Sequence, residues 1–213
     1  MAGAAMGVWA RRVAAVTAAV AWIALALQLA IVVEKMTAEG FPAAVWRFLG
    51  YFTVLTNLLV AVVATACAVR PEGRLAAGPA RLTTVVSIVL VGIIYAALLR
   101  HVWNPAGWQL VADRMLHQAT PLLFLGTWVL AGHGGLGLKD AGWALAPPLG
   151  YLAYALARGA DDGWYAYWFL DPAKLGDGRF VLNTVLLAAV FGATALVFLG
   201  LDRLLAWRSG KGA

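Results

Sequence analysis

The sequence predicts an all-α fold, a polytopic membrane bundle of six transmembrane helices, and two observations support this class. First, 63% of the 213 residues are hydrophobic and 12% are charged, whereas a soluble domain is about half apolar and about a quarter charged. Second, the apolar residues gather into six runs, each near the roughly 20 residues that a helix needs to cross a bilayer. These runs and their short loops fill the chain, so residues 1–213 form a single domain with no separate soluble catalytic domain.

The predicted spans cover residues 12–33, 48–69, 82–100, 114–131, 142–158 and 180–205. The first follows Arg11-Arg12 and resembles a signal peptide, but its apolar run from Val13 to Val33 exceeds the roughly 7–15 residues of a signal core. It is therefore predicted to be a retained span. Turn-forming sequences separate the later spans: Arg70-Pro71-Glu72-Gly73, Asn104-Pro105, Gly132-His133-Gly134-Gly135 and Asp171-Pro172. The fifth span contains Pro147-Pro148, which is tolerated near a helix start.

Charge sets the predicted orientation. The two termini and the loops after the second and fourth spans carry nine Lys/Arg and three Asp/Glu. The loops after the first, third and fifth spans carry seven of each. Because positive residues accumulate in cytoplasmic loops, we expect both termini in the cytoplasm. The sequence thus indicates an integral membrane protein, and the net charge of +6 is attributed to topology rather than to nucleic-acid binding.

The strong polar residues of the spans gather near the predicted outer face. They are Thr53, Thr56, Asn57, Tyr95, Arg100, His101, His117, Gln118, Tyr151, Tyr154, Arg158, Asn183 and Thr184. The inner halves offer mostly small hydroxyls and no ionisable group, and His133 is expected to be exposed in its Gly-rich loop. Polar groups in lipid are costly and mark functional sites. At the α-helical rise, Thr53 lies about 7 Å and His117 about 5 Å below their helix starts, so the two can share a depth.

Local spacing adds two expectations. Thr53, Thr56 and Asn57 lie at i, i+3 and i+4, which places them on one helix face. Pro121 follows His117 by four residues and has no N–H, so the His117 carbonyl loses its helical partner and a bend is expected there. A bend beside an intramembrane histidine is consistent with a pocket.

Several standard chemistries have no counterpart in the sequence. There is no G-x-S-x-G, H-E-x-x-H or G-x-x-x-x-G-K-[ST] motif. The single cysteine, Cys67, and three scattered histidines make a poor metal site, so no metal or cofactor is predicted. His101 and His117 can in principle bind a haem between two helices, which leaves a haem or quinone redox protein as a further alternative.

Three short motifs resemble the androgen-induced protein family, which includes the androgen-dependent TFPI-regulating protein and a bacterial branch of six-span proteins. They are Tyr51-Phe52-Thr53-Val54-Leu55-Thr56-Asn57 at the second span, Leu116-His117-Gln118-Ala119-Thr120-Pro121 at the fourth, and the aromatic loop Trp164-Tyr165-Ala166-Tyr167-Trp168-Phe169-Leu170-Asp171. Relatives usually have Tyr-Pro-Phe in that loop, where this chain has Trp168 in place of the proline.

The resemblance implies a threonine hydrolase of lipid esters and, through the bacterial branch, an integral protein of a bacterial inner (plasma) membrane. Animal members split fatty acid esters of hydroxy fatty acids with an intramembrane threonine and histidine, so Thr53 matches the nucleophile and His117 the general base. A register shift of three residues would exchange Thr53 and Thr56. Among the remaining candidates for substrate binding, the amides of Asn57, Gln118 and Asn183 can hold an oxyanion, and Arg100 or Arg158 can bind a fatty-acid carboxylate.

Two classes of function therefore follow from the sequence. The first is an integral membrane hydrolase acting on a fatty ester, with membrane lipid and a fatty acid or fatty ester as its partners and no nucleic acid. The second is a non-catalytic membrane carrier or lipid-binding protein, which would need a polar path through both leaflets. The apparent lack of ionisable groups in the inner halves argues against a carrier.

Overall fold

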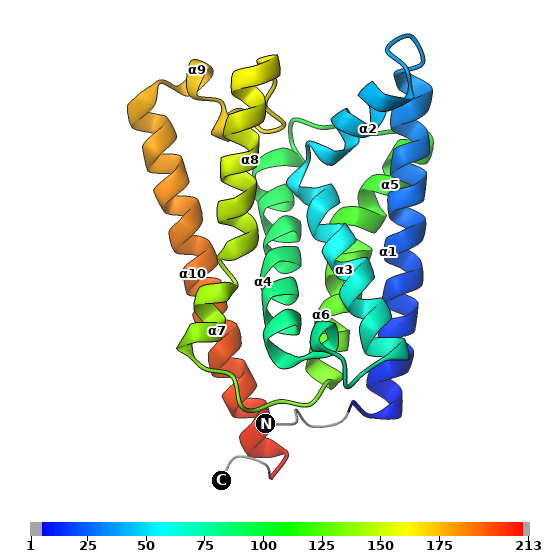
Figure 1. Cartoon of the computed structure of the whole chain (residues 1–213), viewed down its shortest axis with the longest axis vertical. Coiled ribbons are helices and arrows are strands. Elements are labelled where there is room, and N and C mark those ends of the chain that lie inside the picture. The colour runs from blue at the N-terminus through cyan, green and yellow to red at the C-terminus, as the bar shows by residue number, and fades with distance from the viewer. Residues whose placement is uncertain (1–5, 211–213) are drawn as a thin grey trace.

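The computed structural model describes residues 6–210, and every regular element in that range is a helix (Figure 1). The predicted all-α class is confirmed. Four helical segments are long and apolar enough to cross a membrane. They are α1 (Val8–Lys35), α3 (Phe52–Val69), the continuous segment Gly78–Leu99 made of α4 (Gly78–Ile94) and η2 (Tyr95–Leu99), and α10 (Asp177–Arg208). These four match the first, second, third and sixth predicted spans.

The fourth and fifth predicted spans are also helical but less regular. Helix α5 (Gly107–Arg114), the π-helical turn η3 (Met115–Ala119) and α6 (Thr120–Leu130) follow one another without a break. The short α7 (Leu138–Trp143) precedes α8 (Ala146–Asp162), whose first turn contains the two prolines. The connecting segments contain α2 (Phe41–Leu49), η1 (Arg74–Ala76), η4 (Trp168–Leu170) and α9 (Pro172–Leu175).

The second predicted span, 48–69, is broken at Gly50-Tyr51. Helix α2 ends at Leu49, Tyr51 has extended backbone, and α3 begins at Phe52. A Cβ at Gly50 would overlap the Arg158 guanidinium and the Trp164 ring, so glycine lets the backbone pass close to both side chains. The break gives α3 an N-terminus of its own, with Thr53 as its second residue.

The helices form one bundle in which α4 is central, packed against α3, α6 and α10, while α1 packs on α3 and α6. Five of the eight buried residues of α1 are alanine: Ala10, Ala14, Ala18, Ala21 and Ala24. Small residues let helices in lipid approach closely. We call the end that carries α2 and α9 the upper end, and the end where α1 begins and α10 terminates the lower end (Figure 1).

Two π-helical turns, η2 and η3, meet in the upper half of the bundle. Pro121 cannot donate to the His117 carbonyl, and the N–H of Thr120 bonds to the Met115 carbonyl five residues back. The expected bend at the histidine is therefore a π-turn within a continuous helix, and such turns are frequent at functional sites. A Cβ at Gly92 would lie 3.1 Å from the His117 carbonyl oxygen, so glycine allows α4 to pack closely against this turn.

Candidate active site

The structure brings Thr53 and His117 together. The Oγ1 atom of Thr53 lies 3.3 Å from Nε2 of His117, although 64 residues separate them in the chain. Thr53 is supplied by the first turn of α3 and His117 by the π-turn η3. Both side chains are shielded, with 8% of Thr53 and 13% of the His117 side chain exposed. A hydroxyl at hydrogen-bond distance from an imidazole is the arrangement that a serine- or threonine-type hydrolase requires.

Asp113 completes a chain of contacts behind the histidine. Nδ1 of His117 lies 3.0 Å from the Asp113 carbonyl oxygen and 3.3 Å from its Oδ1. Both atoms are acceptors when the carboxylate is charged, so Nδ1 carries the ring proton and Nε2 is left free to accept one. Tyr95 donates to the other carboxylate oxygen at 2.5 Å, and its ring stacks on the imidazole with 3.9 Å between centroids.

Tyr167 lies on the opposite side of Thr53. The backbone N–H of Thr53 donates to the Tyr167 hydroxyl at 3.2 Å, and the same hydroxyl lies 3.3 Å from Oγ1 of Thr53. Tyr167 belongs to the loop between α8 and η4 and is 8% exposed. Burial raises the pKa of this phenol despite its hydrogen bonds with Thr53, because the charged form is disfavoured away from water. Tyr167 is therefore neutral and can donate.

Asn57 holds the two halves of the site in register. Its amide nitrogen donates to the Thr53 carbonyl at 2.8 Å and to the Leu116 carbonyl at 3.3 Å. The side chain is completely buried. Because one amide joins the first turn of α3 to η3, Asn57 fixes the distance between the hydroxyl and the imidazole.

An apolar cavity adjoins Thr53. It has a volume of about 120 Å³ and lies, partly open to the surroundings, between α3, α4, α8, η4 and α10. Thr53, Tyr95 and Tyr167 stand at its polar edge, and its walls are mainly hydrocarbon, from residues such as Val91, Ile94, Leu149, Leu152, Leu187 and Phe191. Ligand sites typically combine apolar walls with a few polar groups.

Three other predicted site residues lie away from Thr53 or make contacts elsewhere. Gln118 and Arg100 are exposed, and neither lines the cavity. The Asn183 amide donates to the Phe169 carbonyl at 3.2 Å, which ties α10 to η4. Their predicted roles in substrate binding stay predictions, but the structure gives them no place beside the Thr53 hydroxyl.

Thr56 is buried but faces a second apolar groove, lined by residues that include Leu59, Pro147 and Tyr154. Its hydroxyl has no hydrogen-bond partner within residues 6–210. Thr53, not Thr56, is thus the threonine at hydrogen-bond distance from His117.

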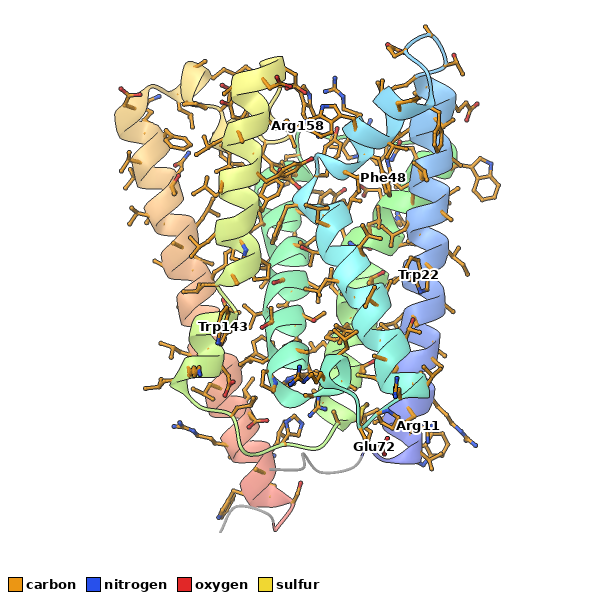
Figure 2. All side chains as sticks on the ribbon, in the orientation of Figure 1. Arg11, Trp22, Phe48, Glu72, Trp143 and Arg158 are labelled. Carbon is orange, nitrogen blue, oxygen red and sulfur yellow. The ribbon has the colours of Figure 1, made fainter. Side chains whose placement is uncertain are left out.

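Arg158 is buried at the upper end, where α8 faces the break between α2 and α3 (Figure 2). It donates to the Trp46 carbonyl at 2.7 Å and to Asp162 at 3.3 Å, and it lies against the rings of Trp46 and Trp164. Burial opposes the charge on Asp162, but hydrogen bonds from Trp164, Trp46 and Arg158 hold the pKa of its carboxyl below the usual range. Arg158 joins helices here rather than lining the cavity.

The lower end holds a second buried cluster, and two expectations about it were wrong. His133 is not exposed: Nδ1 lies 2.9 Å from Oδ1 of Asp202, and the side chain is 6% exposed. Nor do the inner halves lack ionisable groups, since Asp202 of α10 is buried and Arg81 donates to the Gly132 carbonyl. Sequence position alone does not reveal that the loop after α6 folds back onto α10.

Sequence reasoning missed the role of three contacts, those of Asp113, Tyr95 and Tyr167. Asp113 falls one residue outside the predicted span 114–131. Its i−4 spacing from His117 places both on one helix face, so this contact could have been predicted from the sequence. Tyr167 stands in the aromatic loop already singled out, and Tyr95 is one of the polar residues near the predicted outer face, but their approach to Thr53 and His117 depends on how distant segments pack. No protein-family model, curated protein or solved structure matches this chain.

Proposed function

We propose that this protein is an integral membrane hydrolase of lipid esters, with Thr53 as nucleophile and His117 as general base. The observation that carries the proposal is the 3.3 Å contact between Thr53 Oγ1 and His117 Nε2 at the edge of an apolar cavity. It agrees with the resemblance to the androgen-induced protein family, whose animal members use a threonine and a histidine in the same motifs.

The proposal includes six spans. Besides the four long helices, the continuous segment α5–η3–α6 contains eight, five and eleven residues, about 36 Å at the α-helical rise. Helix α8 has 17 residues, about 25 Å, and α7 precedes it. The surplus of Lys/Arg at the lower end supports cytoplasmic termini, with Thr53 near the outer face, and the bacterial branch of the resembled family supports a bacterial inner membrane.

The first half of the reaction is acyl transfer to Thr53. Nε2 of His117 takes the hydroxyl proton as Oγ1 attacks the ester carbonyl carbon, and the π electrons move to the carbonyl oxygen. The C–O bond to the leaving alcohol then breaks, and the alcohol oxygen takes the proton from Nε2. Throughout, Asp113 accepts a hydrogen bond from Nδ1–H of His117 and stabilises the imidazolium.

The second half releases the fatty acid. His117, again neutral, removes a proton from water, the hydroxide oxygen bonds to the acyl carbon, and the bond to Oγ1 breaks as Thr53 recovers its proton from Nε2. The Tyr95 ring stacked on the imidazole keeps Nε2 aimed at the threonine. The acyl chain occupies the apolar cavity, which gives a hydrolase of this kind a reason to reside in a membrane.

The test is ester hydrolysis by the purified protein in detergent micelles with long-chain p-nitrophenyl esters. We expect Thr53→Ala and His117→Gln to lose at least about 10³-fold in turnover. The matched controls are Thr65→Val on the same helix, whose hydroxyl bonds to its own backbone, and His133→Gln, and both should keep turnover within about twofold. Thr56→Val decides between the two threonines of the motif.

Unchanged turnover in both Thr53→Ala and His117→Gln would overturn the proposal. A wild-type protein that binds fatty acid but hydrolyses no ester would point instead to the lipid-binding alternative.

A further inference from the structure

We propose that Tyr167 is a catalytic residue that donates a hydrogen bond to the oxyanion of the tetrahedral intermediate. The inference rests on the proposed ester hydrolysis at Thr53. It assigns to Tyr167 a function that neither Thr53 nor His117 can perform. Acyl transfer places a negative charge on the former carbonyl oxygen, and a donor held ready for it is usually a large contribution to the rate.

The hydrogen-bond directions around Thr53 have one consistent solution. The N–H of Thr53 can only donate, so the Tyr167 oxygen accepts from it. The phenol hydrogen is then directed to Oγ1, the other atom within reach. Oγ1 in turn passes its own hydrogen to Nε2 of His117, which is free to accept because Nδ1 carries the ring proton. The resting site is thus a directed relay that ends on Asp113.

This relay reorganises when an ester reacts. Once Oγ1 is bonded to the acyl carbon it becomes a weak acceptor, while the oxygen on that same carbon becomes an anion. The phenol hydrogen therefore turns from Oγ1 to the neighbouring oxyanion, a small rotation about the C–O bond of the tyrosine. The Thr53 N–H, which donates to the phenol oxygen, polarises the phenol and strengthens it as a donor.

Packing holds the Tyr167 hydroxyl in place. The ring stacks on Phe169 with 5.2 Å between centroids and also meets the edges of Tyr51 and Tyr151. With 8% of the residue exposed, little water competes for the phenol hydrogen. A donor fixed before the reaction needs no reorganisation at the transition state.

The amide donors predicted from sequence are already engaged or turned away. Asn57 uses its amide nitrogen on two carbonyls, and Asn183 donates to Phe169. Gln118 is exposed. Among the side chains described by the structure, Tyr167 is the uncharged donor that reaches Oγ1.

The experiment compares Tyr167→Phe with Tyr165→Phe in the full-length protein. The first removes the hydroxyl and keeps the ring stacked on Phe169; the second removes a hydroxyl two residues away, on a ring that lies against Gly159. We expect Tyr167→Phe to lower kcat about 10²- to 10³-fold with KM within about twofold, and Tyr165→Phe to leave both unchanged. Binding of an alkyl trifluoromethyl ketone, whose adduct with Thr53 carries the oxyanion, should weaken in parallel with kcat.

The outcomes separate this inference from the proposed function. If the wild type hydrolyses esters through Thr53 but Tyr167→Phe keeps full kcat, the oxyanion assignment is wrong and the hydrolase stands. If Tyr167→Phe raises KM and lowers the unfolding temperature while the ketone binds as before, Tyr167 is structural and the assignment is also wrong. If Thr53→Ala itself retains wild-type turnover, the proposed function fails first.

Discussion

The upper and lower ends of the bundle each hold a largely shielded histidine side chain beside a buried aspartate, but of the two pairs only the upper one faces a hydroxyl. His117 lies 3.3 Å from the Asp113 carboxylate and His133 lies 2.9 Å from that of Asp202. At the lower end both ring nitrogens face acceptors, because Nε2 of His133 lies 3.2 Å from the Val129 carbonyl. At the upper end Nε2 faces Thr53.

This difference is why the proposed catalysis is assigned to only one of the two His–Asp pairs. His133 and Asp202 join the loop after α6 to α10, and the second carboxylate oxygen accepts the Gly134 N–H. Both carboxylate oxygens of Asp202 have partners there, and both ring nitrogens of His133 lie at protein oxygens. His117 keeps one nitrogen available next to a cavity, so the same pair of residue types can act on a substrate.

The largest expected effect contrasts the two aspartates. Asp113→Asn should lower kcat about 10²-fold, because the imidazolium loses its charged partner, while KM changes little. Asp202→Asn should leave kcat within about twofold but lower the free energy of unfolding by about 1–3 kcal/mol, because a buried charged hydrogen bond is lost. Kinetics and chemical unfolding of both variants make the check, and equal kinetic loss in the two would erase the distinction between the two ends.

An intermediate effect tests the cavity that distinguishes the upper end. Ala188 lines it, so Ala188→Phe should fill space and exclude part of a long acyl chain. Each methylene kept out of the cavity is expected to raise KM about fourfold, which corresponds to about 0.8 kcal/mol. KM across a series of ester chain lengths gives the measurement. Ala189→Phe, at the exposed neighbouring position, is the matched control, and an identical chain-length profile in the two variants would contradict the cavity's role.

The smallest effect concerns the buried arginine of each end. Arg81 donates to backbone carbonyls, whereas Arg158 also pairs with the Asp162 carboxylate. The pKa of Asp162 is lowered in the folded state, so the stability it contributes is present above its unfolded pKa and is lost as pH falls through the folded value. Asp162→Asn should therefore cost less than about 1 kcal/mol at neutral pH.

The stability difference between wild type and Asp162→Asn should shrink at low pH. Thermal unfolding of both proteins at pH 7 and at about pH 3, below the usual carboxyl pKa, measures this change. The same gap between wild type and Asp162→Asn at both pH values would assign the effect to shape rather than to charge.

Much of the upper site could be predicted because its signals are local. The polar residues of several spans lie near the same helix ends, and a threonine and a histidine at matching depths follow from the helical rise. Asp113 was within reach of the same reasoning through its i−4 spacing to His117. Tyr167 was not, since its contact with Thr53 joins residues 114 positions apart.

Sequence by itself determined that this chain is helical and built for a membrane, because apolar runs of bilayer length must satisfy their backbone hydrogen bonds internally. Tertiary structure alone decided which threonine meets the imidazole, that α3 begins anew after Gly50, and that His133 and Arg158 are buried. Those outcomes depend on the rotation and closeness of helices distant in sequence. Such packing is set by the shapes of all the contacting side chains together, which no single segment records.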